Sequence, residues 1–480
     1  MLIPFTAEDF EELAKPGLTT LPPPIFEKVQ SSASILSKIP PNIPKEKYQH
    51  VYAIGDIHAD LPKLITILVD NGIIDFNMAN LPAFRTSLHS VNWVKANTLI
   101  VLVGDIVDGR RIKTMVPLKY TDIPDTIGNI ELLLHAFIYN LRIRASEMGS
   151  DLMFVSGNHD YHTVLLSSQA HKHRNDYIYE NYVHQTAKNF FGNYENRRTI
   201  LLPFYTCCPY LIITIDGEVA FVHAGLYSSG DDKRSVYERL MGIQNSIHEE
   251  MVKPGIRDIS EVINKDEFTD FLVGETVNGP LWSRDYLKKS RDETCSSVGK
   301  EVNGVDLTIV GHCPTYKPYP DDIYHNELLD LPKYLKRGCK PPGGHCVLVG
   351  CEDHNGPHIA FTDVGLTRAF SQLGDGKTPN LRRIEILRLE HAEAGGGAAE
   401  GKYFNNIFTE STKYIIDPKQ VSEVDIITEM IPHETIQEWP PSGNNNSNSP
   451  PFFGGSRRPL HNRKTRRRKN KSKRKYTRKH

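Results

Sequence analysis

The chain of 480 residues lacks the features of membrane-spanning and disulfide-stabilised proteins. No apolar run approaches the roughly 18 residues that a membrane-spanning helix needs. The first residues, MLIPFTAEDFEELAKPG, have neither the basic start nor the apolar stretch of a secretory signal. The seven cysteines are spaced neither as a disulfide framework nor as a C-x-x-C zinc site. We therefore expect reduced thiols and an intracellular location, in the nucleus or the cytoplasm.

The chain has almost no net charge, because an acidic body and a basic end cancel. It contains 57 Lys and Arg against 58 Asp and Glu. Residues 456–480 hold 14 of the basic residues and no acid, which leaves 43 basic residues against 58 acids in residues 1–455. Cations at this density repel one another, so we expect a disordered basic tail that binds nucleic acid or an acidic partner. A tail that only aids solubility is the simpler alternative.

Composition divides the rest of the chain into three segments. Residues 1–48 are rich in proline and are expected to wrap the surface rather than form a core element. Residues 49–435 carry the alternation of strands and helices that predicts a folded domain. Residues 436–455 are rich in Pro, Ser, Asn and Gly and are expected to be a disordered linker. A linker of this kind before a basic tail resembles, in style and not by a motif, those of proteins encoded by large DNA viruses, and this resemblance implies an infected cell as one expected setting.

Short apolar runs, many of them followed by a glycine, predict the strands. They cover residues 50–54, 98–103, 151–156, 210–215, 218–223, 305–310, 345–350 and 358–365. Apolar residues at helical spacing predict helices over 61–72 and 129–148. Strands alternate with helices early in the chain and follow one another later, so we predict an α/β sandwich with two β-sheets.

Polar side chains directly follow five of these strands. In open α/β sheets, residues beyond the carboxyl ends of the strands face one crevice. A lone Asp or His in such a place is usually a turn former or a core residue, but five clusters together predict one metal site. Carboxylates, an amide and imidazoles suit Mn, Fe or Zn better than Ca or Mg. The five motifs are GDIHAD (55–60), GDIVDGR (104–110), SGNHD (156–160), FVHAG (221–225) and IVGHC (309–313).

The order of these motifs resembles that of the calcineurin-like metallophosphoesterase superfamily and, within it, of the phosphoprotein phosphatases. NGIIDFN, GPLWSRDY (279–286) and TDVGLTRAF (362–370) are similar to the bacterial-type, Shewanella-like branch. Diadenosine-tetraphosphatase-like members share much of the pattern. The resemblance implies that 49–435 is a metallophosphoesterase catalytic domain, with two mixed β-sheets flanked by helices.

The resemblance also implies a role for each motif residue. Asp105 would bridge two divalent ions, which would generate a hydroxide that attacks phosphorus directly. His159 would protonate the leaving oxygen, and Asp108 would orient the ring of His159. The implied metal ligands are Asp56 and His58 for one ion, Asp105 for both, and Asn158, His223 and His312 for the other.

The chain departs from the family pattern at three places. The family reads GDxVDRG, whereas here Gly109 precedes Arg110, and Ser156 stands where many members have an arginine before GNH. We expect Arg110 and Arg284, with Asn158, to bind the substrate phosphate. The alternative is weaker substrate binding, which would make the enzyme slow or change its substrate specificity. Ala59 replaces a family glycine, which is tolerable only if its backbone has φ below zero.

The sequence therefore predicts a phosphatase for phosphomonoesters, with Ser/Thr or Tyr phosphoproteins as the expected substrates. A dinucleoside-polyphosphate or nucleotide phosphohydrolase is one alternative. A catalytically weak scaffold that binds nucleic acid through its basic tail is another. Trp93 and Trp282 are expected to pack rather than to contact substrate, and Asp363 fits a site residue and a turn former equally well.

Overall fold

The computed structural model describes thirteen segments, all within the unit Met1–Gln437. None of the helices in these segments has both the length and the apolarity that crossing a membrane requires. The predicted linker 436–455 and tail 456–480 lie outside the described residues. The described residues are 2–15, 17–76, 87–107, 127–166, 194–226, 236–253, 259–273, 279–283, 304–312, 348–350, 359–363, 384–390 and 407–412.

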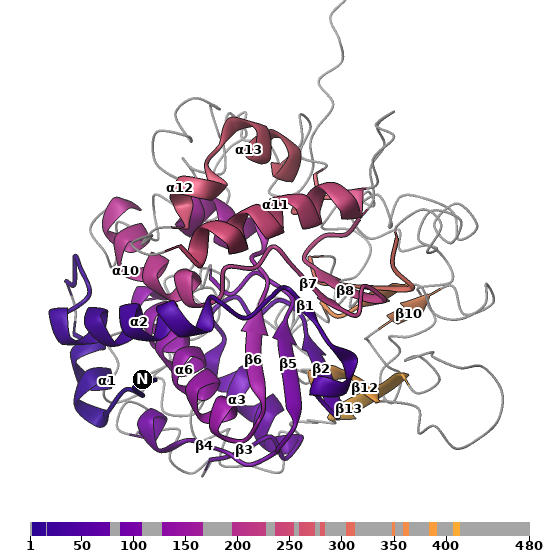
Figure 1. The fold of residues 1–480 in the computed structure, drawn as a ribbon. Helices are drawn as coiled ribbons and strands as arrows, with labels where there is room; N and C mark the ends of the chain where they lie inside the picture. Colours follow the sequence, from indigo (N-terminus) through magenta and orange to yellow (C-terminus); the bar gives the residue numbers. More distant parts are fainter. Residues whose placement is uncertain are drawn as a thin grey trace, which may run out of the picture. The chain divides into compact units, whose positions relative to one another are not determined.

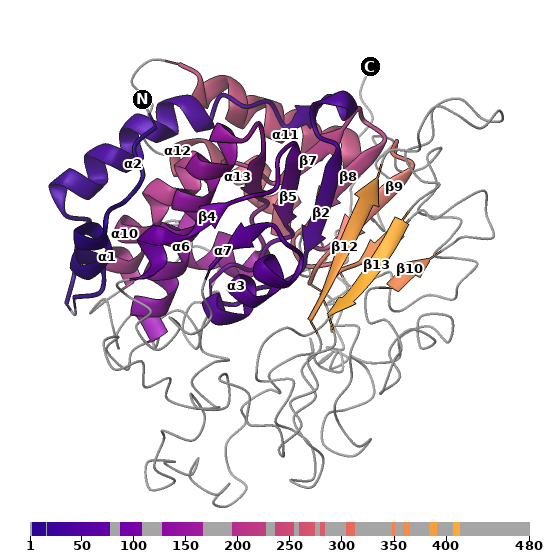
Figure 2. The ribbon, with the colours of Figure 1, turned by 90° about the horizontal axis from the view of Figure 1, so that it is seen from below.

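A five-stranded sheet carries the first three motifs. Its order is β13-β12-β2-β5-β6 (Figure 2). The strands β2, β5 and β6 run parallel, β12 pairs antiparallel with β2, and β13 pairs antiparallel with β12. The three parallel strands are apolar and almost wholly buried, as strands covered on both faces are. The bounds are β2 His50–Ile54, β5 Thr98–Leu102, β6 Asp151–Phe154, β12 Ile384–Glu390 and β13 Ile407–Thr412.

A six-stranded sheet carries the other two motifs. Its order is β1-β7-β8-β9-β11-β10, with β8, β9 and β11 parallel to one another. The bounds are β1 Asn42–Ile43, β7 Ile212–Ile215, β8 Val219–Val222, β9 Leu307–Val310, β10 Leu348–Gly350 and β11 Ile359–Phe361. A separate antiparallel pair joins β3 Ile74–Asp75 to β4 Asn92–Trp93.

Helices flank both sheets (Figure 1). The helix α6 (Ile127–Glu147) packs on β6, and α11 (Val236–Met251) packs on β7. These two sheets and their flanking helices confirm the predicted fold class. The remaining helices are α1 Ala7–Leu13, α2 Pro23–Leu36, η1 Lys45–Lys47, α3 Leu61–Asp70, η3 Leu88–Ser90, α7 Asn158–Asp160, η4 Tyr161–Leu165, α10 Tyr194–Cys207, α12 Ser260–Ile263 and α13 Asp266–Val273.

The proline-rich segment 1–48 contributes to the core, so the expectation that it only wraps the surface is wrong. Thr6 begins α1 with a capping box, and Pro23 begins α2 at a position where the missing N–H is not needed. The two helices bury Phe10 and Val29 completely. Prolines therefore start a helix here instead of preventing one.

The structure contains all eight expected strands, with bounds that differ by a few residues. The two-residue strands β1, β3 and β4 and the longer strands β12 and β13 were not expected from the sequence. In β12, Ile386, Leu387 and Leu389 are buried, whereas Arg388 is partly exposed. The charged residues within IEILRLE weaken the apolar signal, and pairing with β2 over Leu387–Glu390 stabilises the strand instead.

Candidate metal centre

The five motifs meet where the two sheets face each other. Asp56 and His58 follow β2, Asp105 follows β5, and Asn158 follows β6. His223 and His312 follow β8 and β9 in the second sheet. The structure brings all six predicted ligand residues together, and each is at most 4% exposed.

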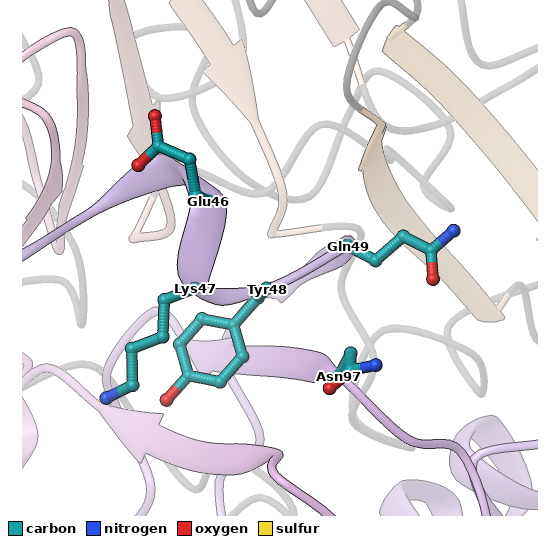
Figure 3. Close-up of a pocket in the computed structure, with 5 residues that line it drawn as sticks. All are labelled: Glu46, Lys47, Tyr48, Gln49 and Asn97. Carbon is teal, nitrogen blue, oxygen red and sulfur yellow. The ribbon is translucent and has the colours of Figure 1, made fainter.

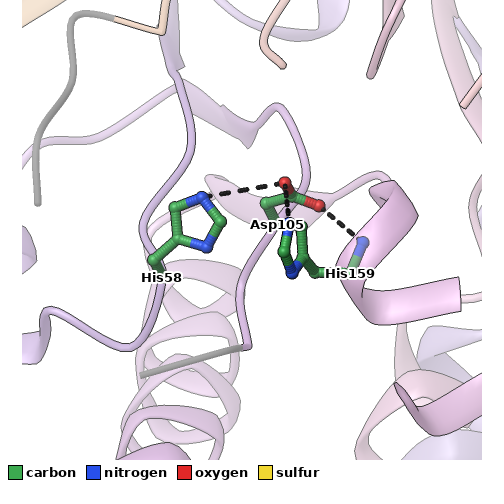
Figure 4. A group of neighbouring side chains, drawn as sticks. All are labelled: His58, Asp105 and His159. Carbon is green, nitrogen blue, oxygen red and sulfur yellow. Dashed lines mark hydrogen bonds and ion pairs between the residues drawn. The ribbon is translucent and has the colours of Figure 1, made fainter. Parts of the chain in front are cut away.

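The carboxylate of Asp105 lies at the centre of this cluster. Its Oδ1 is 3.3 Å from Nε2 of His223 and accepts a 2.9 Å hydrogen bond from the backbone N–H of His159. Its Oδ2 is 3.7 Å from Nε2 of His58 and 3.8 Å from Nε2 of His159 (Figure 4). Two triads that could each hold a cation therefore share Asp105, namely His58–Asp105–His159 and Asp105–His223–His312.

Each of three histidines uses one ring nitrogen for a backbone carbonyl. Nδ1 of His58 donates to the carbonyl of Val107 at 3.2 Å, and Nδ1 of His223 donates to that of Val103 at 2.8 Å. Nε2 of His312 donates to the carbonyl of Trp282 at 3.2 Å. A carbonyl only accepts, so the other nitrogen of each neutral ring keeps its lone pair for a ligand.

The surroundings of His223 test whether these residues fit a cation. Its Nε2 is 2.8 Å from Oδ1 of Asn158 and 3.3 Å from Oδ1 of Asp105. Burial lowers the pKa of His223, but the charges of Asp105 and Asp56 outweigh burial and raise the pKa to about 10. Without a cation the ring is therefore protonated on both nitrogens, and the proton on Nε2 faces the oxygens of Asn158 and Asp105. A divalent ion in place of that proton would bind the ring nitrogen and both oxygens, so the donor set fits a metal.

The two central carboxyl groups have opposite pKa shifts. Burial raises the pKa of Asp105, but His223, His159 and His58 together hold it well below its usual range. Burial and the charge of Asp363 raise the pKa of Asp56 well above its usual range. A cation at this site would favour the ionised form of both carboxyl groups.

Several site residues have strained backbones. His58, Asp105 and His312 have φ of +46°, +48° and +61°, although none is glycine. Ala59 has φ of +61°, so the expectation that its φ is below zero is wrong. The N–H of Ala59 donates to Ile106 at 2.8 Å and its carbonyl accepts from Leu61 at 2.9 Å. These bonds hold Ala59 in a conformation that costs about 1–2 kcal/mol for a non-glycine residue.

Glycines of the motifs leave the space that the ligands occupy. A Cβ on Gly157 would lie 2.2 Å from Oδ1 of Asp105, and one on Gly311 would lie 2.4 Å from Oδ1 of Asp56. Both contacts are far below van der Waals distance, so only glycine fits beside the carboxylates at these two positions.

We predict that Gly311→Ala displaces the carboxylate of Asp56. The cation affinity should fall at least tenfold, and the metal-free protein should lose about 1–3 kcal/mol of stability through overpacking. Isothermal titration with Mn²⁺ and denaturant unfolding measure the two effects. Gly242→Ala in α11 is the matched control, because nothing lies within 4 Å of its Cβ and the change should add about 0.5–1 kcal/mol. Wild-type Mn²⁺ affinity in Gly311→Ala would contradict the prediction.

Asp160 holds two of the motif turns together, a role that sequence reasoning missed. Its Oδ1 accepts from the N–H groups of Ile106 and Val107 at 2.9 and 3.1 Å, and its Oδ2 accepts from Gly157 at 2.8 Å. The hydroxyl of Tyr205 in α10 donates to Oδ1 at 2.7 Å. Burial and the charge of Asp105 raise the pKa of Asp160. In the sequence, Asp160 is marked by its place directly after GNH, whereas no local pattern marks Tyr205.

Other predicted residues have mixed outcomes. Asp108, Arg110 and Arg284 lie outside the described residues. Asp363 is 2% exposed and follows β11, and its backbone N would lie 2.7 Å from a Cβ on Gly55, so it borders the site. Trp93 is 5% exposed and its indole donates to the carbonyl of Lys95, which confirms its packing role.

A hollow of about 450 Å³ lies at the other end of the first sheet (Figure 3). Gln49 and Asn97, which help to line it, immediately precede β2 and β5. The motif residues follow the same strands at their carboxyl ends. The hollow is therefore separate from the metal centre. The residues that line it are Glu46, Lys47, Tyr48, Gln49 and Asn97.

One family model matches the part of the chain that contains all five motifs. The family model Metallophos, described as calcineurin-like phosphoesterase, matches residues 50–316. A protein of Schizosaccharomyces pombe, itself described as uncharacterised, is 23% identical over 279 residues, which cover 55% of this chain and 67% of that protein.

Two solved structures are similar to this chain at low sequence identity. The cold-active protein-tyrosine phosphatase of a psychrophilic Shewanella species has a TM-score of 0.43 and 18% identity, over 74% of this chain and 79% of that one. A protein serine/threonine phosphatase from Saccharomyces cerevisiae has a TM-score of 0.40 and 12% identity, over 82% of this chain and 91% of that one. Similarity at this level concerns the general fold alone.

Proposed function

The chain belongs to the calcineurin-like phosphoesterase family, and from this premise we propose that it is a dinuclear metal-dependent phosphatase for phosphomonoesters. Phosphoserine, phosphothreonine or phosphotyrosine proteins are its proposed substrates. The observation that carries the proposal is the position of Asp105, which belongs to both candidate cation triads. A carboxylate shared between two ions about 3.5–4 Å apart is the arrangement used for phosphoester hydrolysis.

The proposed ligand sets are those that the motif resemblance implies, and the contacts within the cluster support them. Asp56 and His58 would hold one ion with Asp105, and Asn158, His223 and His312 would hold the other. When bound, the ions would supply a nucleophile at neutral pH by acidifying water, and positive charge that offsets the charge of the phosphate. The mixed nitrogen and oxygen donors favour Mn, Fe or Zn.

His159 is the proposed general acid. Its side chain is 13% exposed, whereas those of His58 and His223 are at most 1% exposed, so His159 has more access to a bound substrate. The hydroxyl of Thr163 donates to the carbonyl of His159 at 2.6 Å, and the N–H of His159 donates to Asp105. The backbone is thus held while the ring gives its proton to the leaving oxygen. Asp108 is proposed to orient this ring.

We predict that Arg110→Ala and Arg284→Ala each raise KM and lower kcat for a phosphomonoester. The loss in kcat/KM should be about 10- to 100-fold, because hydrogen bonds to a charged phosphate contribute about 1.5–3 kcal/mol. Steady-state kinetics with p-nitrophenyl phosphate measure the effect, and Arg111→Ala is the neighbouring control. Unchanged activity in both variants would remove this assignment.

The decisive experiment is metal-dependent hydrolysis by the full chain. The protein is stripped with a chelator and supplied separately with Mn²⁺, Fe²⁺ or Zn²⁺, and release of p-nitrophenol from p-nitrophenyl phosphate is followed. We expect no activity without metal and recovery with at least one ion. No hydrolysis with any ion would overturn the proposal in favour of a binding scaffold.

A substrate panel separates the two enzymatic alternatives. Phosphoserine and phosphotyrosine peptides are compared with diadenosine tetraphosphate at equal concentrations. Faster release of phosphate from the peptides supports the proposed function. Faster cleavage of diadenosine tetraphosphate would instead support a dinucleoside-polyphosphate hydrolase.

For residues 456–480, binding of nucleic acid or an acidic protein is a separate proposal that does not enter the reaction.

A further inference from the structure

The segment Gly279–Ser283 packs directly against the metal centre. The carbonyl of Pro280 accepts a 3.1 Å hydrogen bond from the N–H of Ala224, next to His223. The carbonyl of Trp282 accepts from Nε2 of His312 at 3.2 Å, and the two rings meet edge to face with centroids 5.9 Å apart. Trp282 thus contacts a proposed ligand through both its backbone and its side chain.

His162 holds the other end of Trp282. It lies in η4, four residues after Asn158, and is 1% exposed. The indole Nε1 of Trp282 donates to Nε2 of His162 at 3.0 Å, and the ring centroids are 5.3 Å apart. An indole N–H can only donate, so Nε2 of His162 has to act as the acceptor. The contact joins the turn after β6 to the segment that contacts His312.

We propose that His162 is a positioning residue for the metal centre. By accepting from the indole of Trp282, it fixes the segment that places a carbonyl on Nε2 of His312. This carbonyl selects the ring form of His312 in which Nδ1 keeps its lone pair for a cation. The inference rests on the proposed function.

Backbone hydrogen bonds fix the start of the segment that carries Trp282. The N–H of Gly279 donates to Val273 at 2.9 Å and that of Leu281 donates to Leu272 at 3.3 Å, which ties the segment to α13. A Cβ on Gly279 would lie 2.4 Å from the carbonyl of Leu272. The backbone is therefore anchored at its start, and the hydrogen bond to His162 anchors its Trp282 end.

The test compares His162→Phe with His162→Gln. Phenylalanine fills the ring volume without an acceptor, whereas the amide oxygen of glutamine can still accept from the indole. Mn²⁺ affinity is measured by titration calorimetry. We expect a 10- to 100-fold loss in His162→Phe, as for other residues that orient metal ligands, and recovery of most of the affinity in His162→Gln.

Tryptophan emission reports the contact itself. In a Trp93→Phe, Trp439→Phe background, Trp282 is the one tryptophan that remains, since the chain has three. Its emission in the metal-free protein should shift in His162→Phe and stay near that of the parent in His162→Gln. Unchanged emission in His162→Phe would overturn the proposal.

A double-mutant cycle with Trp282→Phe separates positioning from general stability. Once the indole donor is removed, His162→Phe should lower Mn²⁺ affinity no further. Independent losses of affinity, or wild-type affinity in His162→Phe, would contradict the proposal. If His162→Phe does not fold, Trp282→Phe and His162→Gln still test the same contact. If the wild type binds Mn²⁺ but hydrolyses no substrate, the proposed function fails, while the emission and affinity measurements still decide the role of His162.

Discussion

Replacing Asp105 by asparagine should lower kcat/KM for p-nitrophenyl phosphate by about a thousandfold or more. Asp105 belongs to both candidate triads, so the loss of its charge weakens both cation sites at once. Metal ions contribute several kcal/mol of charge stabilisation to phosphoryl transfer, and each 1.36 kcal/mol is about tenfold in rate. The amide keeps the shape of the carboxylate and one oxygen that can accept from the N–H of His159.

Calorimetric titration with Mn²⁺ gives the second readout for Asp105→Asn. We expect a lower affinity for both ions, whereas a variant at a residue that binds one ion should weaken one site. Asp75→Asn is the matched control, because Asp75 is exposed at the end of β3 and contributes to neither triad. If Asp105→Asn binds two equivalents of Mn²⁺ with wild-type affinity, Asp105 does not bridge them.

Replacing His159 by asparagine should lower kcat by about 10²- to 10⁴-fold, the range expected for removal of a general acid. The loss should be greater for phenyl phosphate than for p-nitrophenyl phosphate, because p-nitrophenolate leaves without much help from a proton. KM should change little. Steady-state kinetics with the two substrates measure the difference.

The geometry offers a second role for His159, which the same variant tests. Nε2 of His159 lies in one triad with Asp105 and His58, with the His58 and His159 rings perpendicular and their centroids 5.0 Å apart. If His159 is the acid, Mn²⁺ affinity stays at the wild-type value in His159→Asn. A tenfold or greater loss of affinity, with equal rate losses for both substrates, would make His159 a ligand instead.

The motifs made most of the candidate site predictable from the sequence. Each ends an apolar run with a glycine at most two residues from an acid, an amide or a histidine, and parallel strands bring such ends together. The carboxylate of Asp56 and the N–H of His312 are joined by a 2.9 Å hydrogen bond, although 256 positions separate them. The strand pattern predicted that they share one face, but it could not predict this bond.

Supporting contacts were not predictable in the same way. Tyr205 and His162 are an ordinary aromatic residue and an ordinary histidine in the sequence. Tyr205 acts on Asp160 and His162 on Trp282, and both partners are distant in the chain and at no recognisable spacing. The positive φ of Ala59 likewise depends on its partner Ile106, on a different loop.

The sequence by itself determined the family, the two-sheet class and the chemical types of the candidate ligands, because these depend on local patterns of apolar strands, glycines and donor residues. Only the tertiary structure decided which ring nitrogen of His58, His223 and His312 donates to a backbone carbonyl, that Asp105 belongs to two triads, and that the proline-rich start belongs to the core. These features depend on where backbone carbonyls and side chains from distant segments meet, and such meetings are set by the packing of the two sheets.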